Sequence, residues 1–454
     1  MDPSQDPDVP LSQSEDCLFV NVFTPADALS GGQLPIMIYI HGGAFLTGSS
    51  QGAFDAYDGG QMAASQHVIV ASCNYRLGVL GFLAYPDAGL DGNYGIKDQR
   101  ACIEWVRENA MSFGGDVGRV TIWGESAGAQ SVLIHTVSPA SAGLFQRAIV
   151  ESSPALTLMN AEDAGGNGKA VAKQLNCNKG AASDIAHCIR GAALNDIFKA
   201  SSDVATSWMD ITRALSLKTP TASFLPFKPV VDGPGGDIPV QPISALLNGT
   251  AKGVVPTLIG TNANEFWAFL KPGVLPKILH GLTVRAVFDV LFGVKSGNDV
   301  FDWYNTGEAE GNETAIADNA VTEYMFRCAS EAIALQLPEA FVYAYDHLAS
   351  FGPSVWPKLH LGQCAHKVCH EAELPMVFGN TLINETWSDV ELAISANMQR
   401  AWASFATSGD PGEGWAPFES SQREKMIIKD DLVLKTTVDG SPCVALFDKT
   451  GYFH

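Results

Sequence analysis

The sequence predicts an α/β fold built on a mostly parallel central sheet with helices on both faces. Short, nearly continuous apolar runs rich in β-branched residues are typical of strands that are buried on both faces. Such runs occur at residues 18–23, 34–40, 68–72, 120–123 and 148–150. An amphipathic stretch at 96–109 separates two of them, and alternation of strand and helix favours a parallel sheet.

The remainder of the chain is predicted to return to this sheet after two insertions. Strand signals resume at 257–260 and 341–345, and an amphipathic helix at about 390–406 is followed by a glycine and a proline, which are typical of helix ends. Residues 154–256 and 266–338 instead have mixed helix and loop character. We therefore predict one domain over residues 1–454, with these insertions above the carboxyl edge of the sheet.

Composition excludes several classes of protein. The chain has 454 residues, of which 46% are hydrophobic and 17% are charged, so it has ample material for a large core and is too apolar to be disordered. The net charge of −21 excludes a nucleic-acid partner, because phosphate contacts need a Lys/Arg surface. No apolar run approaches the ~18 residues that span a bilayer, so no transmembrane segment is predicted.

A G-x-S-x-G motif suggests a nucleophilic serine. Gly124-Glu125-Ser126-Ala127-Gly128 follows the apolar run at 120–123 and precedes a helix-like run at 129–136. A serine on a tight strand-to-helix turn is the arrangement of a nucleophile elbow. The alternative is a glycine-rich turn in an ordinary α/β protein.

A second glycine-rich segment, His41-Gly42-Gly43-Ala44, follows the apolar run at 34–40. Glycines allow backbone N–H groups to converge on one point, as an oxyanion hole requires. The alternative is a tight turn. The two motifs support each other because both follow predicted strands.

A serine hydroxyl needs a base to accept its proton and an acid to orient that base. Among the ten histidines, His41 belongs to the glycine loop, and we expect His67 and His135 to be structural. His370 is the candidate base. Its neighbours Cys364 and Cys369 raise the alternative of a metal site, but the spacing does not match one, and we predict neither metal nor cofactor.

The acid is expected between the serine and the histidine in chain order. Glu265 is the candidate because it is the single carboxylate in a polar loop directly after the strand signal at 257–260. Spacing alone does not select it from the 49 acidic residues.

The indications of cellular compartment conflict. Nine cysteines and the sequons at Asn248, Asn312 and Asn384 suit a secretory route. The first residues, however, are acidic and polar, and they lack the basic start and apolar core of a signal peptide. Either the protein is intracellular with reduced cysteines, or the chain belongs to a longer precursor.

Together these motifs resemble the type-B carboxylesterase/cholinesterase/lipase family, which has the α/β-hydrolase fold. The resemblance extends through most of the chain. It is carried by the elbow motif and by the segments at 14–22, 74–78, 98–99, 113–116, 402–406 and 409–411.

Carried over residue by residue, the resemblance implies a catalytic triad with Ser126 as nucleophile, Glu265 as acid and His370 as base. It implies that the oxyanion is held by backbone N–H groups, those of Gly43, Ala44 and Ala127. It also implies a structural ion pair between Arg76 and Asp98, and a buried acid, Glu125, beside the nucleophile.

The resemblance further implies disulfides Cys177–Cys188 and Cys328–Cys443, and it leaves Cys364–Cys369 as a third. Cys73 and Cys102 are expected to be buried free thiols. Cys17 pairs in the family with an upstream cysteine. We therefore expect that the first strands, a signal peptide and this partner precede the present chain, and that the protein is a secreted glycoprotein.

Three departures from the family pattern are apparent. Ala44 stands where many members have a third glycine, and Asn264 and Phe266 replace a more usual Asp and Gly beside Glu265. No tryptophan precedes Cys17 to bind a quaternary ammonium, which argues against choline esters.

We predict a serine hydrolase that cleaves carboxylic esters through an acyl-enzyme, with a small-molecule or lipid ester as substrate. Two alternatives are a non-catalytic adhesion or structural relative, and a lipase acting on long-chain acylglycerols.

Overall fold

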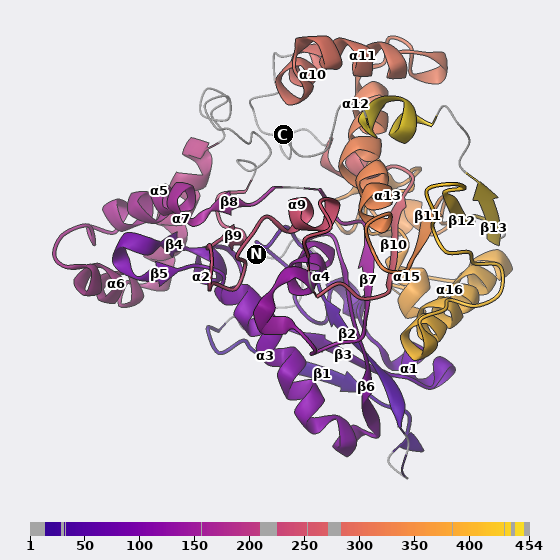
Figure 1. Cartoon of the computed structure of the whole chain (residues 1–454), viewed down its shortest axis with the longest axis horizontal. Coiled ribbons are helices and arrows are strands. Elements are labelled where there is room, and N and C mark those ends of the chain that lie inside the picture. Colours follow the sequence, from indigo (N-terminus) through magenta and orange to yellow (C-terminus); the bar gives the residue numbers. More distant parts are fainter. Residues whose placement is uncertain are drawn as a thin grey trace.

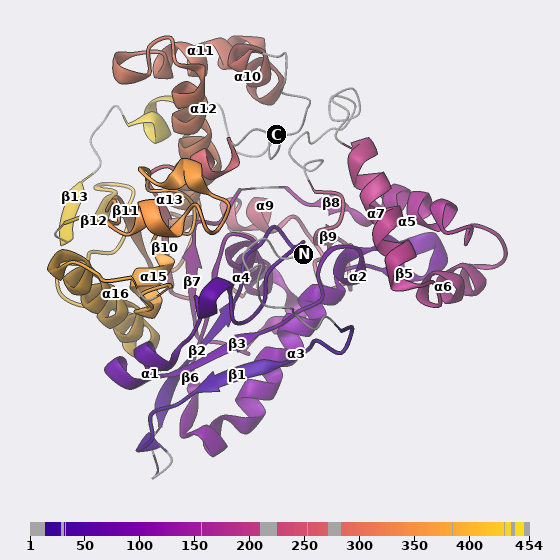
Figure 2. The same cartoon turned by 180° about the vertical axis from the view of Figure 1, so that it is seen from behind.

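The computed structural model describes residues 14–448 apart from 29–30, 32, 156, 209–224, 252, 271–282, 384, 431 and 437–440. A central sheet has helices against both faces, and two helical groups lie farther out (Figures 1 and 2). Within the described ranges, no helix is long and apolar enough to cross a membrane. The sequon at Asn384 and the first residues of the chain, on which expectations were based, lie outside the described residues.

The central sheet contains nine strands among the described residues. In spatial order they are β1 (Val20–Phe23), β3 (Ile69–Cys73), β2 (Leu34–Ile40), β6 (Gly115–Glu125), β7 (Arg147–Glu151), β10 (Thr257–Asn262), β11 (Ala340–Tyr345), β12 (Glu424–Ile428) and β13 (Leu432–Thr436). Neighbouring strands are parallel, except that β1 is antiparallel to β3 and β12 to β13. The predicted mostly parallel sheet is therefore confirmed.

The apolar sequence of β2 explains its position inside the sheet. All seven of its residues are buried. Successive side chains of a strand point to opposite faces, so β2 contributes to two cores at once. Ile36, Ile38 and Ile40 belong to one hydrophobic cluster, and Met37 and Tyr39 belong to another.

Helices cover both clusters. On the first face, α3 (Tyr94–Asn109) and α4 (Ala127–Val137) contribute apolar side chains such as Ile103 and Val132. On the second face, α16 (Asp389–Ser408) contributes Trp402 and Phe405. The helices predicted at 96–109 and 390–406 thus correspond to α3 and α16.

The two strands after α16 were not predicted. β12 begins with Glu424 and Lys425, and their charges interrupt the apolar run that marked the other strands. Lys425 Nζ lies 2.6 Å from an oxygen of the buried Glu331, so a long-range ion pair supports the charged start of β12. A contact of this kind has no local sequence signal.

The remaining short elements connect or flank the sheet. They are α1 (Gly60–Gln66), α2 (Gly78–Phe82), β4 (Ala84–Tyr85), β5 (Leu90–Asp91), β8 (Met159–Asn160), β9 (Val230–Val231), α9 (Pro242–Leu247), α14 (Gly352–Val355) and α15 (Leu374–Phe378).

Two helical groups fall within the predicted insertions. The first contains α5 (Ala161–Gln174), α6 (Ala182–Arg190) and α7 (Leu194–Trp208). The second contains α10 (Val284–Phe292), α11 (Val294–Tyr304), α12 (Glu313–Val321), a π-helical turn (Thr322–Arg327) and α13 (Cys328–Ala334). These groups lie on different sides of the molecule (Figure 1), and the second has a hydrophobic cluster of its own.

The described residues contain four disulfides, with sequence separations from 5 to 115. Cys177–Cys188, Cys328–Cys443 and Cys364–Cys369 are all present as expected, and Cys17 is the free cysteine among the described residues. The prediction that Cys73 and Cys102 are free thiols is wrong, because they form a disulfide between the end of β3 and α3. Their Cα atoms lie 6.4 Å apart because α3 packs beside β3, which the sequence did not reveal.

Candidate active site

Ser126 lies on a sharp turn between β6 and α4. Its backbone has φ 56° and ψ −121°, a conformation that is strained for a residue with a side chain. The Ser126 N–H donates to the Glu151 carbonyl at 2.9 Å, and the Ser126 carbonyl accepts from the Gln130 N–H at 2.9 Å. The elbow predicted from the motif is thus present, and sheet and helix hydrogen bonds hold its strained residue.

Close backbone packing explains the glycines of the motif. A Cβ atom on Gly128 would lie 1.9 Å from the Ile40 carbonyl oxygen, and one on Gly124 would lie 2.6 Å from the Gly128 carbonyl carbon. Side chains at these positions would push α4 away from β2 and β6. The close approach of the helix places Ser126 at the end of β6, where it is buried.

The glycine loop after β2 lies directly against Ser126. A Cβ atom on Gly42 would lie 3.0 Å from the Ser126 Cβ atom. Gly43 and Ala44 both have positive φ, 98° and 56°, and the Gly43 carbonyl accepts from the Thr47 N–H at 3.0 Å. Among the described residues, the N–H groups of Gly43, Ala44 and Ala127 donate to no protein acceptor, so they are available to a bound oxyanion.

Two loops bring Glu265 and His370 together. Glu265 follows β10, and His370 follows the loop that the Cys364–Cys369 disulfide closes. A β-bridge joins Asn264 to Cys369, and His370 Nδ1 lies 2.6 Å from Glu265 Oε2. The other oxygen of Glu265 accepts from the Asn262 N–H at 2.6 Å, so both carboxylate oxygens have partners.

Burial and charge act in opposite directions on His370. Burial lowers the pKa of His370, but the charge and hydrogen bond of Glu265 raise it, and the pKa lies above its ordinary value. The imidazolium form is therefore stabilised by Glu265, as a base that takes up a proton during a reaction requires.

The second ring nitrogen of His370 faces the residue next to the serine. His370 Nε2 lies 3.1 Å from Glu125 Oε1, and no hydrogen bond joins it to Ser126 Oγ within the described part of the chain. Hydrogen bonds of this kind are often formed only when substrate is bound. Burial raises the pKa of Glu125 well above its ordinary value, with a further contribution from the charge of Glu371.

A buried polar network that sequence reasoning missed lies behind the site. Glu373 accepts from Ser152 Oγ at 3.3 Å and from Asn262 Nδ2 at 2.5 Å. Burial raises the pKa of Glu373 to about 7. Glu151 accepts hydrogen bonds from the indoles of Trp123 and Trp402. No spacing in the sequence distinguishes these acids from the others, although Glu373 lies close to His370 in the chain.

Aromatic rings flank His370. Phe269 and Phe326 have ring centroids 5.4 and 5.5 Å from the imidazole centroid. They come from the turn that contains Glu265 and from the π-helical turn before α13. Neither ring was predicted, because each belongs to a different element from His370.

Several other residues singled out in the sequence make structural contacts, whereas His67, expected to be structural, is exposed. Arg76 and Asp98 form a two-point ion pair with nitrogen–oxygen distances of 2.7 and 2.8 Å. His135 is buried between Ser141 and Gln99, and His41 stacks on the ring of Tyr75.

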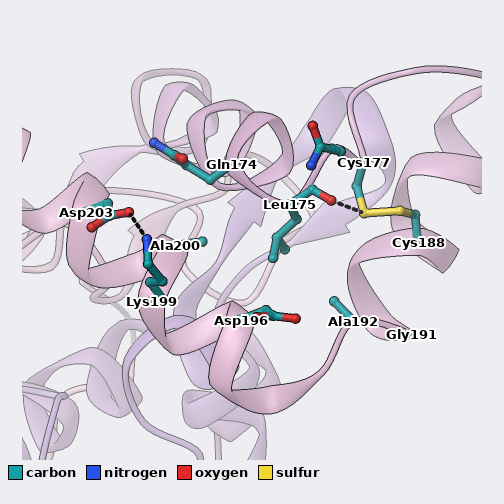
Figure 3. A pocket seen from close by; sticks show the side chains of 11 residues that line it. Gln174, Leu175, Cys177, Cys188, Gly191, Ala192, Asp196, Lys199, Ala200 and Asp203 are labelled. Carbon is teal, nitrogen blue, oxygen red and sulfur yellow. Dashed lines mark hydrogen bonds and ion pairs between the residues drawn. A yellow bond between two sulfur atoms is a disulfide. The ribbon is translucent and has the colours of Figure 1, made fainter.

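A cavity of about 490 Å³ lies elsewhere, between α5, α6 and α7 (Figure 3). Its lining includes the Cys177–Cys188 disulfide, Lys199 and Asp203, and it includes none of the candidate site residues. Lys199 and Asp203 pair with each other at 3.2 Å across one turn of α7. The cavity therefore belongs to the helical group and is separate from the serine.

Comparison with known proteins identifies the family. A sequence profile of the carboxylesterase family matches residues 1–443. The chain is 33% identical to the para-nitrobenzyl esterase of Bacillus subtilis, over 97% of this chain and 84% of that protein. It is also 33% identical to the cAMP-regulated D2 protein of Dictyostelium discoideum, over 98% of this chain and 80% of that protein.

Solved structures support the same relationship. A thermophilic para-nitrobenzyl esterase superposes with a TM-score of 0.77 at 30% identity, covering 96% of this chain and 84% of that one. The sequence matches, this superposition and the mostly parallel sheet agree. The chain is therefore a member of the carboxylesterase family, a carboxylic-ester hydrolase with the α/β-hydrolase fold.

Proposed function

We propose that the chain hydrolyses esters through an acyl-enzyme on Ser126, with His370 as base and Glu265 as its orienting acid. The observation that carries this proposal is the meeting of three separate segments. The strained elbow holds Ser126, the glycine loop lies against it, and the hydrogen-bonded His370–Glu265 pair contacts the residue before it.

In the first half-reaction, His370 Nε2 accepts the Ser126 proton as Ser126 Oγ attacks the ester carbonyl carbon. The N–H groups of Gly43, Ala44 and Ala127 stabilise the resulting oxyanion. The tetrahedral intermediate then expels the alcohol, which takes the proton from His370. Ser126 is left as an ester of the acyl group.

In the second half-reaction, His370 accepts a proton from water, and the hydroxide attacks the acyl carbon. Collapse of the second intermediate returns the proton to Ser126 and releases the carboxylic acid. Glu265 orients the imidazole and stabilises the imidazolium in both halves.

Covalent labelling tests the proposal directly. A fluorophosphonate probe is expected to modify the wild-type protein at Ser126, as mapped by mass spectrometry of the labelled peptide. Ser126→Ala is expected to abolish labelling and to lower kcat on the order of a millionfold. Ser131→Ala is the control, because it removes a buried hydroxyl from α4 that donates to the Ala127 carbonyl and accepts from Gln99 Nε2. Wild-type protein that folds but takes up no label contradicts the proposal.

We also propose that the protein matures in an oxidising, secretory compartment. Four disulfides among the described residues support this, because such bonds persist outside the reducing cytosol. The sequons at Asn248 and Asn312 lie on exposed positions, where a glycan can attach. Non-reducing peptide mapping of the protein from its source tests this proposal, and free thiols at these cysteines would contradict it.

A further inference from the structure

The loop that carries Glu265 is held from outside by two residues of the second helical group. Asp318 lies on α12, and Thr322 begins the π-helical turn one helical turn later. Both are buried, with 1% and 2% of their surface exposed. Their side chains reach the residues on either side of the proposed acid.

Three hydrogen bonds make the connection. Asn264 Nδ2 donates to Asp318 Oδ2 at 2.9 Å, and Thr322 Oγ1 donates to Asp318 Oδ1 at 3.2 Å. Thr322 Oγ1 in turn accepts from the Phe266 N–H at 3.1 Å. Asp318 therefore binds the residue before Glu265, and through Thr322 it also fixes the residue after it.

The same loop meets the histidine on its other side. The Asn264 N–H donates to the Val368 carbonyl at 2.8 Å, within the loop that leads to His370. Asn264 thus lies between Asp318 and the histidine loop. A shift of Asn264 or Phe266 would move the Glu265 carboxylate relative to the imidazole it contacts at 2.6 Å.

We propose that Asp318 and Thr322 are positioning residues, which hold Asn264 and Phe266 so that the Glu265 carboxylate stays aimed at His370. This inference rests on the proposed triad. It assigns the second helical group a part in the reaction, although neither residue touches the reacting atoms. We call Asp318, Thr322 and their hydrogen bonds to Asn264 and Phe266 the clamp. Displacing a catalytic group by about 1 Å can cost on the order of a hundredfold in rate, so loss of the clamp is expected to slow the reaction.

Burying a carboxylate such as that of Asp318 costs free energy, because the charged form loses its contact with water. Burial raises the pKa of Asp318 to about 6, while the hydrogen bonds from Asn264 and Thr322 lower it. The charge of Lys367 and the backbone N–H of Trp267 also lower it. The hydrogen bonds from Asn264 and Thr322 give each oxygen of this buried carboxylate a partner.

A side-chain exchange tests the clamp. Asn264→Asp places a second carboxylate opposite Asp318, and repulsion is expected to displace the loop and to lower kcat by about tenfold to a hundredfold. Asp318→Asn alone is expected to cost less, because the Asn264 amide can turn its oxygen toward the new amide. The double variant restores one donor and one carboxylate, and it is expected to recover kcat to within about twofold of wild type.

A second variant tests the clamp without changing the charge of any side chain. Thr322→Val is isosteric and removes the hydroxyl that joins Asp318 to Phe266. We expect kcat to fall with little change in KM, and the acid limb of the kcat/KM profile to move to lower pH, because His370 loses support from Glu265. Thr407→Val is the matched control, since the Thr407 hydroxyl donates to the Ala403 carbonyl within α16.

The outcomes separate this inference from the proposed triad. Failure of the wild type to label at Ser126 overturns the triad. A labelled, active wild type in which Thr322→Val behaves like Thr407→Val, or in which the double variant stays as slow as Asn264→Asp, overturns the clamp.

Discussion

The two halves of the proposed triad are positioned by different kinds of contact. Ser126 is held by backbone hydrogen bonds within the sheet and by the close approach of α4 to β2. Glu265 and His370 are held by side-chain hydrogen bonds, a β-bridge and a disulfide between loops. The first half depends on two glycines of one five-residue motif, Gly124 and Gly128. The second depends on residues that are far apart in it.

This difference predicts how each half fails. Damage to the elbow should prevent folding, because the same contacts join helix and sheet. Substitutions in the loops that carry Glu265 and His370 should leave the fold intact but lower kcat. The variants below test this distinction, from the largest expected effect to the smallest.

Gly128→Ala is expected to destabilise the native protein strongly. The added Cβ atom would lie 1.9 Å from the Ile40 carbonyl oxygen, and neither backbone can move without separating α4 from the sheet. We expect a loss of about 3 kcal/mol or more in the free energy of unfolding. Denaturant titration followed by tryptophan fluorescence measures this loss.

Gly166→Ala is the control for that substitution. Gly166 lies in α5, and its added Cβ atom would have no neighbour within 4 Å. Alanine is expected to raise stability there by about 0.5–1 kcal/mol. Equal stability of the two variants would contradict the explanation of the elbow.

Glu265→Gln is expected to leave the fold intact and to lower kcat by about a thousandfold or more. The neutral amide no longer raises the pKa of His370, so this pKa is expected to fall, because burial lowers it and only the charges of Glu371 and Glu373 still raise it. The base is needed in its neutral form, so the acid limb of residual kcat/KM should move to lower pH. Steady-state rates across pH measure both effects, and a limb that moves to higher pH would refute the pairing.

The disulfides allow a milder test. Replacing Cys364 and Cys369 by alanine opens a loop of sequence separation 5, which is expected to cost about 2 kcal/mol of stability. Because His370 follows Cys369 directly, kcat is also expected to fall, by about tenfold.

Removal of the Cys328–Cys443 disulfide is expected to have the opposite balance of effects from removal of Cys364–Cys369. It closes a separation of 115, so its removal should cost about 5 kcal/mol but change the kcat of the folded protein less. Thermal unfolding and single-point rates on the same preparations compare the two pairs. An equal loss of rate in both would show that the small loop does not position the base.

The difference between local backbone contacts and contacts between distant segments also decided what could be predicted from the sequence. The elbow, the glycine loop and β2 were predictable because each is encoded by consecutive residues with a strong local pattern. Glu265 and His370 were selected through chain order and family resemblance. Asp318, Thr322 and Glu373 gave no signal, because each acts through a contact with a distant segment. The Cys73–Cys102 disulfide was missed for the same reason.

The order of the triad along the chain also has a consequence for synthesis. Ser126 is made early, whereas His370 lies 105 residues beyond Glu265. A ribosome-bound chain that has not reached residue 370 carries the serine without its base, and strands β12 and β13 have not yet been made. With this triad, the nascent polypeptide cleaves no ester, and hydrolysis begins only when translation of most of the chain is complete.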